Sequence, residues 1–179
     1  KGTIEYKCAD CDAEYTEEIP MLGQTALSDC TVTLSYHKTA YDGKEKTPKI
    51  TVKNSNGIVS EEDYTVTYAD NVNAGNAKVI ITAKTGDVSI KGTVEKGFII
   101  AKAKQSVSAA STDEQIHVKA STEIQADGIG DISLETSTPD LVDINETTVT
   151  GKKAGLALIK VTVSGDANQE EASTMDAVG

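Results

Sequence analysis

The sequence contains no tryptophan and no arginine, and aromatic residues of all kinds make up only 4% of its 179 residues. With Phe98 as the single phenylalanine, the core must consist mainly of Val, Ile, Leu and Ala. Small aliphatic side chains suit thin β-sandwiches, in which each sheet contributes one layer to the core. The 17 basic residues are all lysines, and the formal net charge is −11. Because arginine is the preferred residue for bidentate phosphate contacts, we expect neither nucleic acid nor an anionic membrane as a partner.

Cysteine is equally scarce, and Cys8, Cys11 and Cys30 are the only three. An odd, low number argues against a disulfide framework. Cys8 and Cys11 form a C-x-x-C pair, which could supply half of a zinc site but lacks a second pair of ligands. We therefore expect no metal and no other cofactor, and this pair is the one weak metal-binding candidate. Cys30 opens an expected strand and should be a small buried side chain.

Long apolar runs are also missing, since no stretch approaches the roughly 18 residues that a membrane helix needs, and we expect no membrane insertion. Helical periodicity is nearly absent. Alternation dominates instead, in short segments rich in Val, Ile, Thr and Tyr. The clearest expected strands are Thr31–Ser35, Lys49–Lys53, Tyr64–Tyr68, Lys78–Ala83, Thr93–Ile100, Gln115–Ala120, Asp131–Thr136 and Ala157–Val163. Many short strands at this spacing predict an all-β sandwich or barrel.

Composition divides the chain into three sections. Residues 1–26 show a strand–turn–strand pattern that is too short to bury a core, and we predict a β-hairpin that ends a preceding repeat. Residues 27–101 contain four of the six tyrosines, whereas residues 102–179 contain no aromatic residue. We predict one β-sandwich module for each of these two sections. The chain begins inside an expected strand, so we expect it to be a fragment of a longer protein.

The middle section carries, in order, the segments Thr31–Ser35, Tyr41–Lys44, Asp63–Tyr68 and Gly92–Val94. In this order and spacing they resemble the repeat modules of large surface proteins from Clostridia-type gut bacteria. The opening section, with Tyr6–Asp12, resembles short cysteine-containing repeats that precede such modules. Those repeats often carry histidine at the position of Gln24, where this chain does not.

The third section contains Ser137–Ile144, Thr150–Gly155 and Ile159–Val163. It is similar to bacterial immunoglobulin-like group 2 domains, and its Thr-Gly-Lys-Lys-Ala-Gly motif indicates a strand, a turn that needs glycine and a return strand. Ala172–Gly179 lacks the usual Thr/Val alternation, so we expect a weak, frayed or missing last strand. Together the resemblances imply two tandem immunoglobulin-like β-sandwich modules preceded by a short β-hairpin.

Tyrosine offers the only recognition chemistry that stands out, because aromatic faces stack on sugar rings and anchor interfaces. Tyr64 and Tyr68 lie four apart on one expected strand, so they should share a face and pack in the core with Phe98. Tyr36 and Tyr41 flank a loop and should be more exposed. The residues to examine first for ligand binding are therefore Tyr36, Tyr41, Asp70, Asn71 and Asn73.

No catalytic arrangement emerges from the remaining polar residues. His37 and His117 have no nucleophile and acid near them in sequence, and both should be exposed. The acidic segment Glu61–Asp63 does not match the spacing of a calcium loop and should be a solvated turn. Without a nucleophile–base pair, a phosphate loop or a metal cluster, we do not expect an enzyme.

These observations favour a non-catalytic, extracellular module pair that spaces or displays neighbouring domains of a bacterial cell-surface or secreted protein. The resemblances also imply polysaccharide or a protein of a host or cell surface as partners. The alternative hypothesis is a carbohydrate-binding or host-adhesion module that uses the tyrosine-bearing loops of the middle section.

Overall fold

The computed structural model describes residues 2–7, 14–19 and 23–179. Within these ranges the chain is an all-β fold of the sandwich type, with no α-helix and two short 3-10 turns. The turns are η1 (Leu27–Asp29) and η2 (Glu61–Asp63). The all-β fold class predicted from the strand pattern is confirmed.

The chain divides into two compact units, which are described separately below. Unit 1 comprises Lys1–Lys38, Glu45–Asn71 and Asn76–Ile99. Unit 2 comprises Ile100–Gly179 together with two short segments, Thr39–Lys44 and Val72–Gly75. Most of the middle section predicted from composition therefore lies in unit 1, and the whole third section lies in unit 2.

Two strands near the N-terminus form an antiparallel hairpin, as the opening pattern predicts. They are β1 (Gly2–Lys7) and β2 (Glu14–Ile19). A third short strand, β3 (Thr25–Ala26), pairs in parallel with β10 (Ile90–Lys91) instead of with the hairpin. Thr25 and Ala26, at the end of the predicted opening section, are therefore paired with a strand of the middle section.

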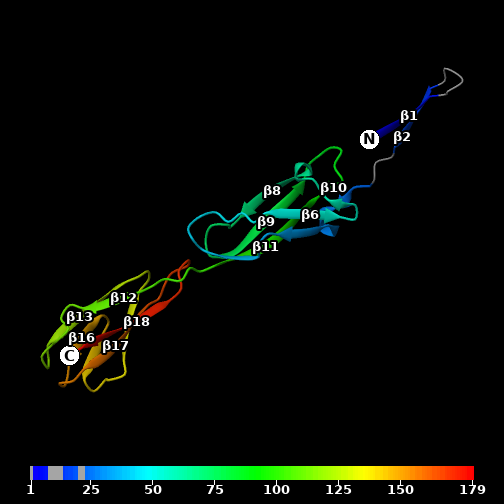
Figure 1. Cartoon of the computed structure of the whole chain (residues 1–179). Coiled ribbons are helices and arrows are strands. Elements are labelled where there is room, and N and C mark those ends of the chain that lie inside the picture. Colours follow the sequence, from blue (N-terminus) through cyan, green and yellow to red (C-terminus); the bar gives the residue numbers. More distant parts are fainter. Residues whose placement is uncertain (1, 8–13, 20–22) are drawn as a thin grey trace. The chain divides into compact units, whose positions relative to one another are not determined.

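The strands after the hairpin form two sheets, which can be followed in Figure 1. One sheet has the order β4-β6-β7, with β4 (Thr31–Leu34), β6 (Ile50–Asn54) and β7 (Gly57–Ile58). The other has the order β5-β11-β9-β8, with β5 (Lys38–Ala40), β8 (Tyr64–Ala69), β9 (Gly75–Ala83) and β11 (Thr93–Ala101). Within unit 1 the buried side chains of these sheets are Leu34, Ile50, Val52, Tyr64, Ala77, Val79, Ile81 and Phe98. Leu27 of η1, Val59 and Ile90 of β10 (Ile90–Lys91) are also buried and complete the core.

Unit 2 contains a four-stranded sheet and a three-stranded sheet. The first has the order β12-β13-β16-β15, with β12 (Ser108–Ser111), β13 (Ser121–Asp127), β15 (Val142–Asn145) and β16 (Thr148–Gly151). The second has the order β14-β17-β18, with β14 (Ile132–Thr136), β17 (Ala157–Val163) and β18 (Ala172–Val178). The core between them is aliphatic and includes Ile124, Val142, Val149, Ala157, Ile159, Val161 and Val178.

One expected strand, Gln115–Ala120, is wrong. This segment is a turn that leads into β13, and Lys119 has a positive φ of 70°. Backbone hydrogen bonds explain why a turn forms here instead of a strand. The Lys119 N–H donates to the Gly151 carbonyl and the Ala120 N–H donates to the His117 carbonyl, both at 2.8 Å. The alternation of apolar residues here reflects a turn held by long-range contacts.

The C-terminal segment also differs from expectation. Ala172–Val178 forms the seven-residue strand β18, which pairs with β17 along its whole length from Ala172↔Val163 to Val178↔Ala157. Val178 is 2% exposed and joins the core. The prediction of a weak, frayed or missing strand at this position is therefore wrong. Pairing and burial at alternate positions compensate for the low β-propensity of Ser, Asp and Ala.

Candidate functional site

Tyr36 is the first of the predicted ligand-binding residues, and the structure gives it a packing role. Its ring is half-buried and meets Phe98 edge to face, with ring centroids 6.1 Å apart and an interplanar angle of 85°. Its exposure is intermediate, whereas Tyr64 is buried. Edge-to-face pairs of this kind stabilise a core beyond the area they bury.

Tyr41 and Asp70 lie on loops. Tyr41 is half-buried, and its N–H donates to the Ala101 carbonyl at 2.8 Å. Asp70 is exposed and has a φ of 55°, in the left-handed region that Asp tolerates better than most residues. Asp70 therefore serves the turn that follows β8.

Asn71 joins two loops of unit 1. Its carbonyl accepts the Lys46 N–H at 2.8 Å, and its side-chain Nδ2 donates back to the Lys46 carbonyl at 3.1 Å. Lys46 is 8% exposed, which is rare for a lysine, and the sequence analysis did not single it out. No periodic pattern could have found it, because Lys46 lies in a loop and is buried by contacts distant in sequence.

Asn73 belongs to a segment of unit 2 that bonds to Asn168, in the turn before β18. The Asn168 Nδ2 donates to the Asn73 Oδ1 at 3.3 Å, and the Ala74 N–H donates to the Asn168 Oδ1 at 2.8 Å. Asp166 fixes the Asn168 turn, because its Oδ1 accepts the N–H groups of Asn168 and Gln169 at 2.7 Å each. Asn73 is therefore part of a hydrogen-bonded turn network.

Of the five predicted residues, Tyr36, Asp70 and Asn71 fall in unit 1 and Tyr41 and Asn73 fall in unit 2. In four of the five, a ring, a main-chain group or an amide is engaged in packing or hydrogen bonding: Tyr36 and Tyr41 contact strand β11, whereas Asn71 and Asn73 connect loops to other loops. The sequence analysis correctly identified loop residues with polar chemistry. Which of their groups are already engaged depends on contacts that only the fold creates.

Tyr64 and Tyr68 instead line a groove of about 360 Å³ on unit 1, together with Lys49, Glu61 and two apolar side chains. Tyr64 is 5% exposed, and Tyr68 is half-buried, with its hydroxyl donating to the Pro48 carbonyl at 2.9 Å. The predicted core position of Tyr64 is confirmed. Tyr68 lies on the same face of β8 but is only half-buried.

Burial changes the acidity of both groove tyrosines. It raises the pKa of Tyr64, with a further contribution from the Glu61 carboxylate. It raises the pKa of Tyr68 as well, and the neighbouring Tyr36 adds to the effect. Both phenols are therefore held in the neutral, hydrogen-bonding form more firmly than free tyrosine.

The cysteine and histidine predictions have separate outcomes. Cys30 is 8% exposed, its Sγ bonds to the Ala26 carbonyl at 3.4 Å, and burial, followed by the Asp29 charge, raises the pKa of its thiol. The prediction of a small buried side chain is confirmed. His37 and His117 are exposed, as expected. Cys8 and Cys11 lie outside the described residues.

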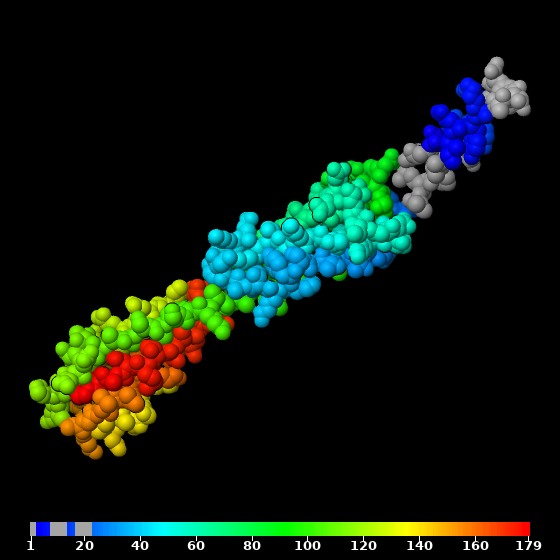
Figure 2. Space-filling view, viewed as in Figure 1, coloured from blue at the N-terminus to red at the C-terminus, as the bar shows by residue number. Residues whose placement is uncertain are grey.

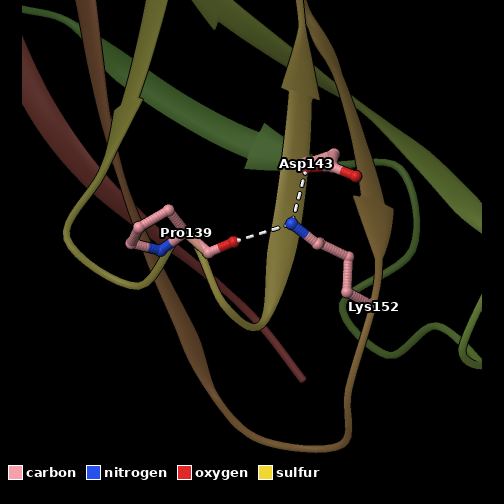
Figure 3. Close-up of polar contacts among 3 residues, drawn as sticks. All are labelled: Pro139, Asp143 and Lys152. Carbon is pink, nitrogen blue, oxygen red and sulfur yellow. Dashed lines mark hydrogen bonds and ion pairs between the residues drawn. The ribbon is translucent and has the colours of Figure 1, made fainter.

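The Thr-Gly-Lys-Lys-Ala-Gly motif holds a loop of unit 2 against the end of β16. Lys152 inserts its Nζ between the Pro139 carbonyl, at 3.2 Å, and the Asp143 carboxylate, at 2.9 Å (Figure 3). Its N–H also donates to the Leu141 carbonyl at 2.7 Å. One lysine thereby ties the 139–143 segment in three places.

Glycine at two motif positions permits close approach. A Cβ on Gly151 would lie 3.2 Å from the His117 carbonyl oxygen. Gly155 has a φ of +154°, and a Cβ there would lie 3.0 Å from a methyl group of Leu141. The motif that resembles a family signature is therefore explained by the geometry of one loop junction.

Among the described residues, two buried polar atoms without a hydrogen-bond partner lie in unit 2, and no sequence pattern indicated them. The Ser111 Oγ and the Asp176 Oδ2 are buried without a hydrogen-bond partner among the described residues. Their strands, β12 and β18, contact each other, and Figure 2 shows the green and red segments side by side on the surface of this unit. The side chain of Asp176 points inward from a strand at the edge of its sheet.

The hairpin presents a pair of rings that the sequence analysis did not select. Tyr6 and Tyr15 stack with centroids 4.8 Å apart and an interplanar angle of 9°, and they are 43% and 60% exposed. They are directly opposite in the strand register, and Lys7 forms an ion pair with Glu14 at 3.1 Å beside them. The alternation in both strands could have indicated this pair.

Across the described residues, no group of three or more His, Cys, Asp or Glu side chains could hold a metal ion. The same part of the chain contains no helix that is long and apolar enough to span a membrane. No protein-family model matches the chain, and no curated protein sequence matches it.

Proposed function

We propose that the chain is a non-catalytic part of a longer bacterial cell-surface or secreted protein, where it spaces and displays neighbouring domains. The fold suits this role because each compact unit has its own buried apolar side chains. A spacer must resist unfolding while exposed, and independent cores allow each unit to do so.

The observation that carries the proposal is that polar loop residues hold loops together through hydrogen bonds and ion pairs. Lys152 ties the 139–143 segment, Asn71 joins its loop to the Lys46 loop, and Asn168 holds the Asn73 segment. Asn71 and Asn73 are predicted ligand-binding residues, and Lys152 belongs to the Thr-Gly-Lys-Lys-Ala-Gly motif. Their engagement in loop fastening supports a structural role over a catalytic one.

A display assay tests this function. The chain is inserted between a cell-wall anchor and an epitope tag on a bacterial surface, and antibody labelling of the tag is measured. Compared with a flexible Gly/Ser linker of equal length, the folded chain should increase labelling, and Tyr41→Ala should leave the increase unchanged. Equal labelling with both inserts would overturn the spacer proposal.

Carbohydrate binding is the second candidate, and the groove of unit 1 favours it. Two tyrosines, a lysine and a carboxylate along about 360 Å³ supply aromatic surface and hydrogen-bonding groups of the kind that sugar rings require. Lys49 and Glu61 are both exposed and can reach a bound molecule.

A glycan array with the whole chain separates the two functions. Carbohydrate binding predicts signals that fall strongly in Lys49→Ala and Glu61→Ala, with Lys53→Ala as a control exposed lysine outside the groove. An array without signal, combined with enhanced labelling in the display assay, would leave only the spacer function.

A further inference from the structure

Among the strands that the structure describes, β8 is an edge strand, and none of them pairs with its outer side. In the sheet order β5-β11-β9-β8 it has one neighbour, β9, among the strands that the structure describes. Its six residues, Tyr64–Ala69, thus offer a row of backbone donors and acceptors for a further strand. Figure 1 shows β8 beside β9 at one side of this sheet.

The β8 edge also lacks the features that usually prevent strand addition. Edge strands are commonly protected by charged side chains, proline or very short length. Every other edge strand of five or more residues in the described ranges contains a charged side chain, such as Glu135 in β14 and Asp176 in β18. β8 contains no charge and no proline.

The sequence of β8 is a palindrome, Tyr64-Thr65-Val66-Thr67-Tyr68. In an antiparallel pair of two identical strands centred on Val66, each Tyr64 faces a Tyr68 and each Thr65 faces a Thr67. Aromatic pairs and Thr–Thr pairs are among the favourable cross-strand combinations. This register also keeps the inward residues of both strands on the same face, because the side-chain period is two.

We propose that two copies of this chain associate through antiparallel pairing of their β8 strands, which joins two four-stranded sheets into one. The interface is isologous, since each copy uses the same strand and the two-fold axis passes through the Val66 pair. This inference goes beyond the proposed spacer function and does not depend on it.

Charges at the two ends of β8 complement each other in this arrangement. Glu61 lies just before the strand, whereas Lys49 follows Pro48, whose carbonyl accepts the hydroxyl of Tyr68 near the other end. Both charges line the groove beside the strand. Antiparallel pairing brings Lys49 of each copy toward Glu61 of the second copy, and symmetry repeats this contact.

The association should be weak and reversible. The net charge of −11 repels a second copy at long range, and Asp70 adds an acid at the Lys49 end. Backbone hydrogen bonds along a short strand must therefore supply most of the attraction. A monomer–dimer equilibrium that depends on protein concentration is the expected behaviour.

A charge-swap experiment on the full chain tests the strand and its register. Thr65 and Thr67 are both exposed, so the double variants T65K/T67K and T65E/T67E should fold normally. Each variant alone places like charges opposite each other across the strand pair and should be monomeric where the wild-type chain dimerises. An equal mixture places lysine opposite glutamate and should restore the dimer, as measured by sedimentation velocity.

A matched control adds the same charges elsewhere. The variant T51K/S55K changes two exposed residues on and after β6 and should dimerise like the wild-type chain. Because added lysines make this acidic chain less acidic, loss of the dimer in T65K/T67K cannot come from overall repulsion. The proposal is overturned if the wild-type chain stays monomeric at all concentrations, if T65K/T67K still dimerises, or if the mixture remains monomeric.

Discussion

The two compact units build sandwich-type cores from different side chains. Unit 1 contains Tyr64 and Phe98 in its buried core, with Tyr36 packed against the phenyl ring. The core cluster of unit 2 consists only of Ile, Val and Ala. A core that contains tyrosine must provide for a hydroxyl group, whereas an aliphatic core depends only on shape and burial. The units should therefore respond differently to substitution and to pH.

The edges of the two units differ as well. β18 of unit 2 carries an inward Asp176 whose Oδ2 has no hydrogen-bond partner among the described residues, which is costly but discourages strand addition. β8 of unit 1 carries no such charge. An unsatisfied polar group can therefore protect one sheet edge from pairing, and its absence leaves another edge available.

The largest effect should come from truncating one core at a time. Phe98→Ala should lower the free energy of unfolding of unit 1 by about 3–5 kcal/mol, because it removes a buried ring and the partner of Tyr36. Ile159→Ala should destabilise unit 2 by about 2–5 kcal/mol. Hydrogen exchange read by mass spectrometry resolves the two regions. If each substitution loosens both units equally, the cores are not independent.

Replacing Asp176 should stabilise unit 2. Asp176→Val removes the buried Oδ2, which has no hydrogen-bond partner among the described residues, and should raise the free energy of unfolding by about 1–3 kcal/mol in chemical denaturation. Ser173→Val, at an exposed position of the same strand, serves as the control and should have little effect. A lower stability in Asp176→Val would mean that the carboxylate makes a favourable interaction in the folded chain.

Alkaline pH should lower the stability of unit 1 through its buried tyrosines and cysteine. Burial raises the pKa values of Tyr64, Tyr68 and Cys30 in unit 1, so the unfolded chain releases these protons first. Stability from these groups is fully present below their usual pKa values, which are about 8.5 for cysteine and 10 for tyrosine. It should be lost as the pH rises through the raised folded-state values.

The measurement is a series of unfolding curves at increasing pH, with Tyr64→Phe as the diagnostic variant. Removing this phenol should flatten the alkaline decline of unit 1. A decline of the same slope in wild-type and variant chains would show that Tyr64 does not contribute to the pH dependence.

The smallest effect concerns the loop lysine of unit 2. Lys152→Met should destabilise unit 2 by no more than about 1 kcal/mol, because its ion pair with Asp143 is largely exposed. Lys153→Met is the matched control, since the adjacent lysine makes no side-chain hydrogen bond among those found in the described residues. If the two variants lower the melting temperature equally, Lys152 does not stabilise this loop more than its neighbour does.

Much of the fold could be predicted from periodicity alone. The segment Ala157–Val163 has apolar residues at every second position and forms β17 with the same bounds, because these side chains pack on one face. Gln115–Ala120 alternates too, yet it forms a turn, since bonds to distant groups such as the Gly151 carbonyl outweigh local preference. Alternation predicts a strand only where a neighbouring strand is available to pair with it.

The candidate site shows the same limit more strongly. Polar and aromatic loop residues were correctly picked as noteworthy, but Tyr36 packs against Phe98 and Asn71 bonds to Lys46. These partners lie 62 and 25 residues away in sequence, as their numbers show, so no local pattern could identify them. The buried position of Lys46 was invisible for the same reason.

By itself the sequence determined the all-β class, the aliphatic character of the cores and the palindrome of β8, because these follow from composition and from the two-residue period of a strand. Only tertiary contacts make β8 an edge among the described strands, pair β18 along its full length and leave the Asp176 Oδ2 without a hydrogen-bond partner in the described part of the chain. These properties depend on which strands become neighbours. Strand neighbours are selected by contacts between residues that are far apart along the chain.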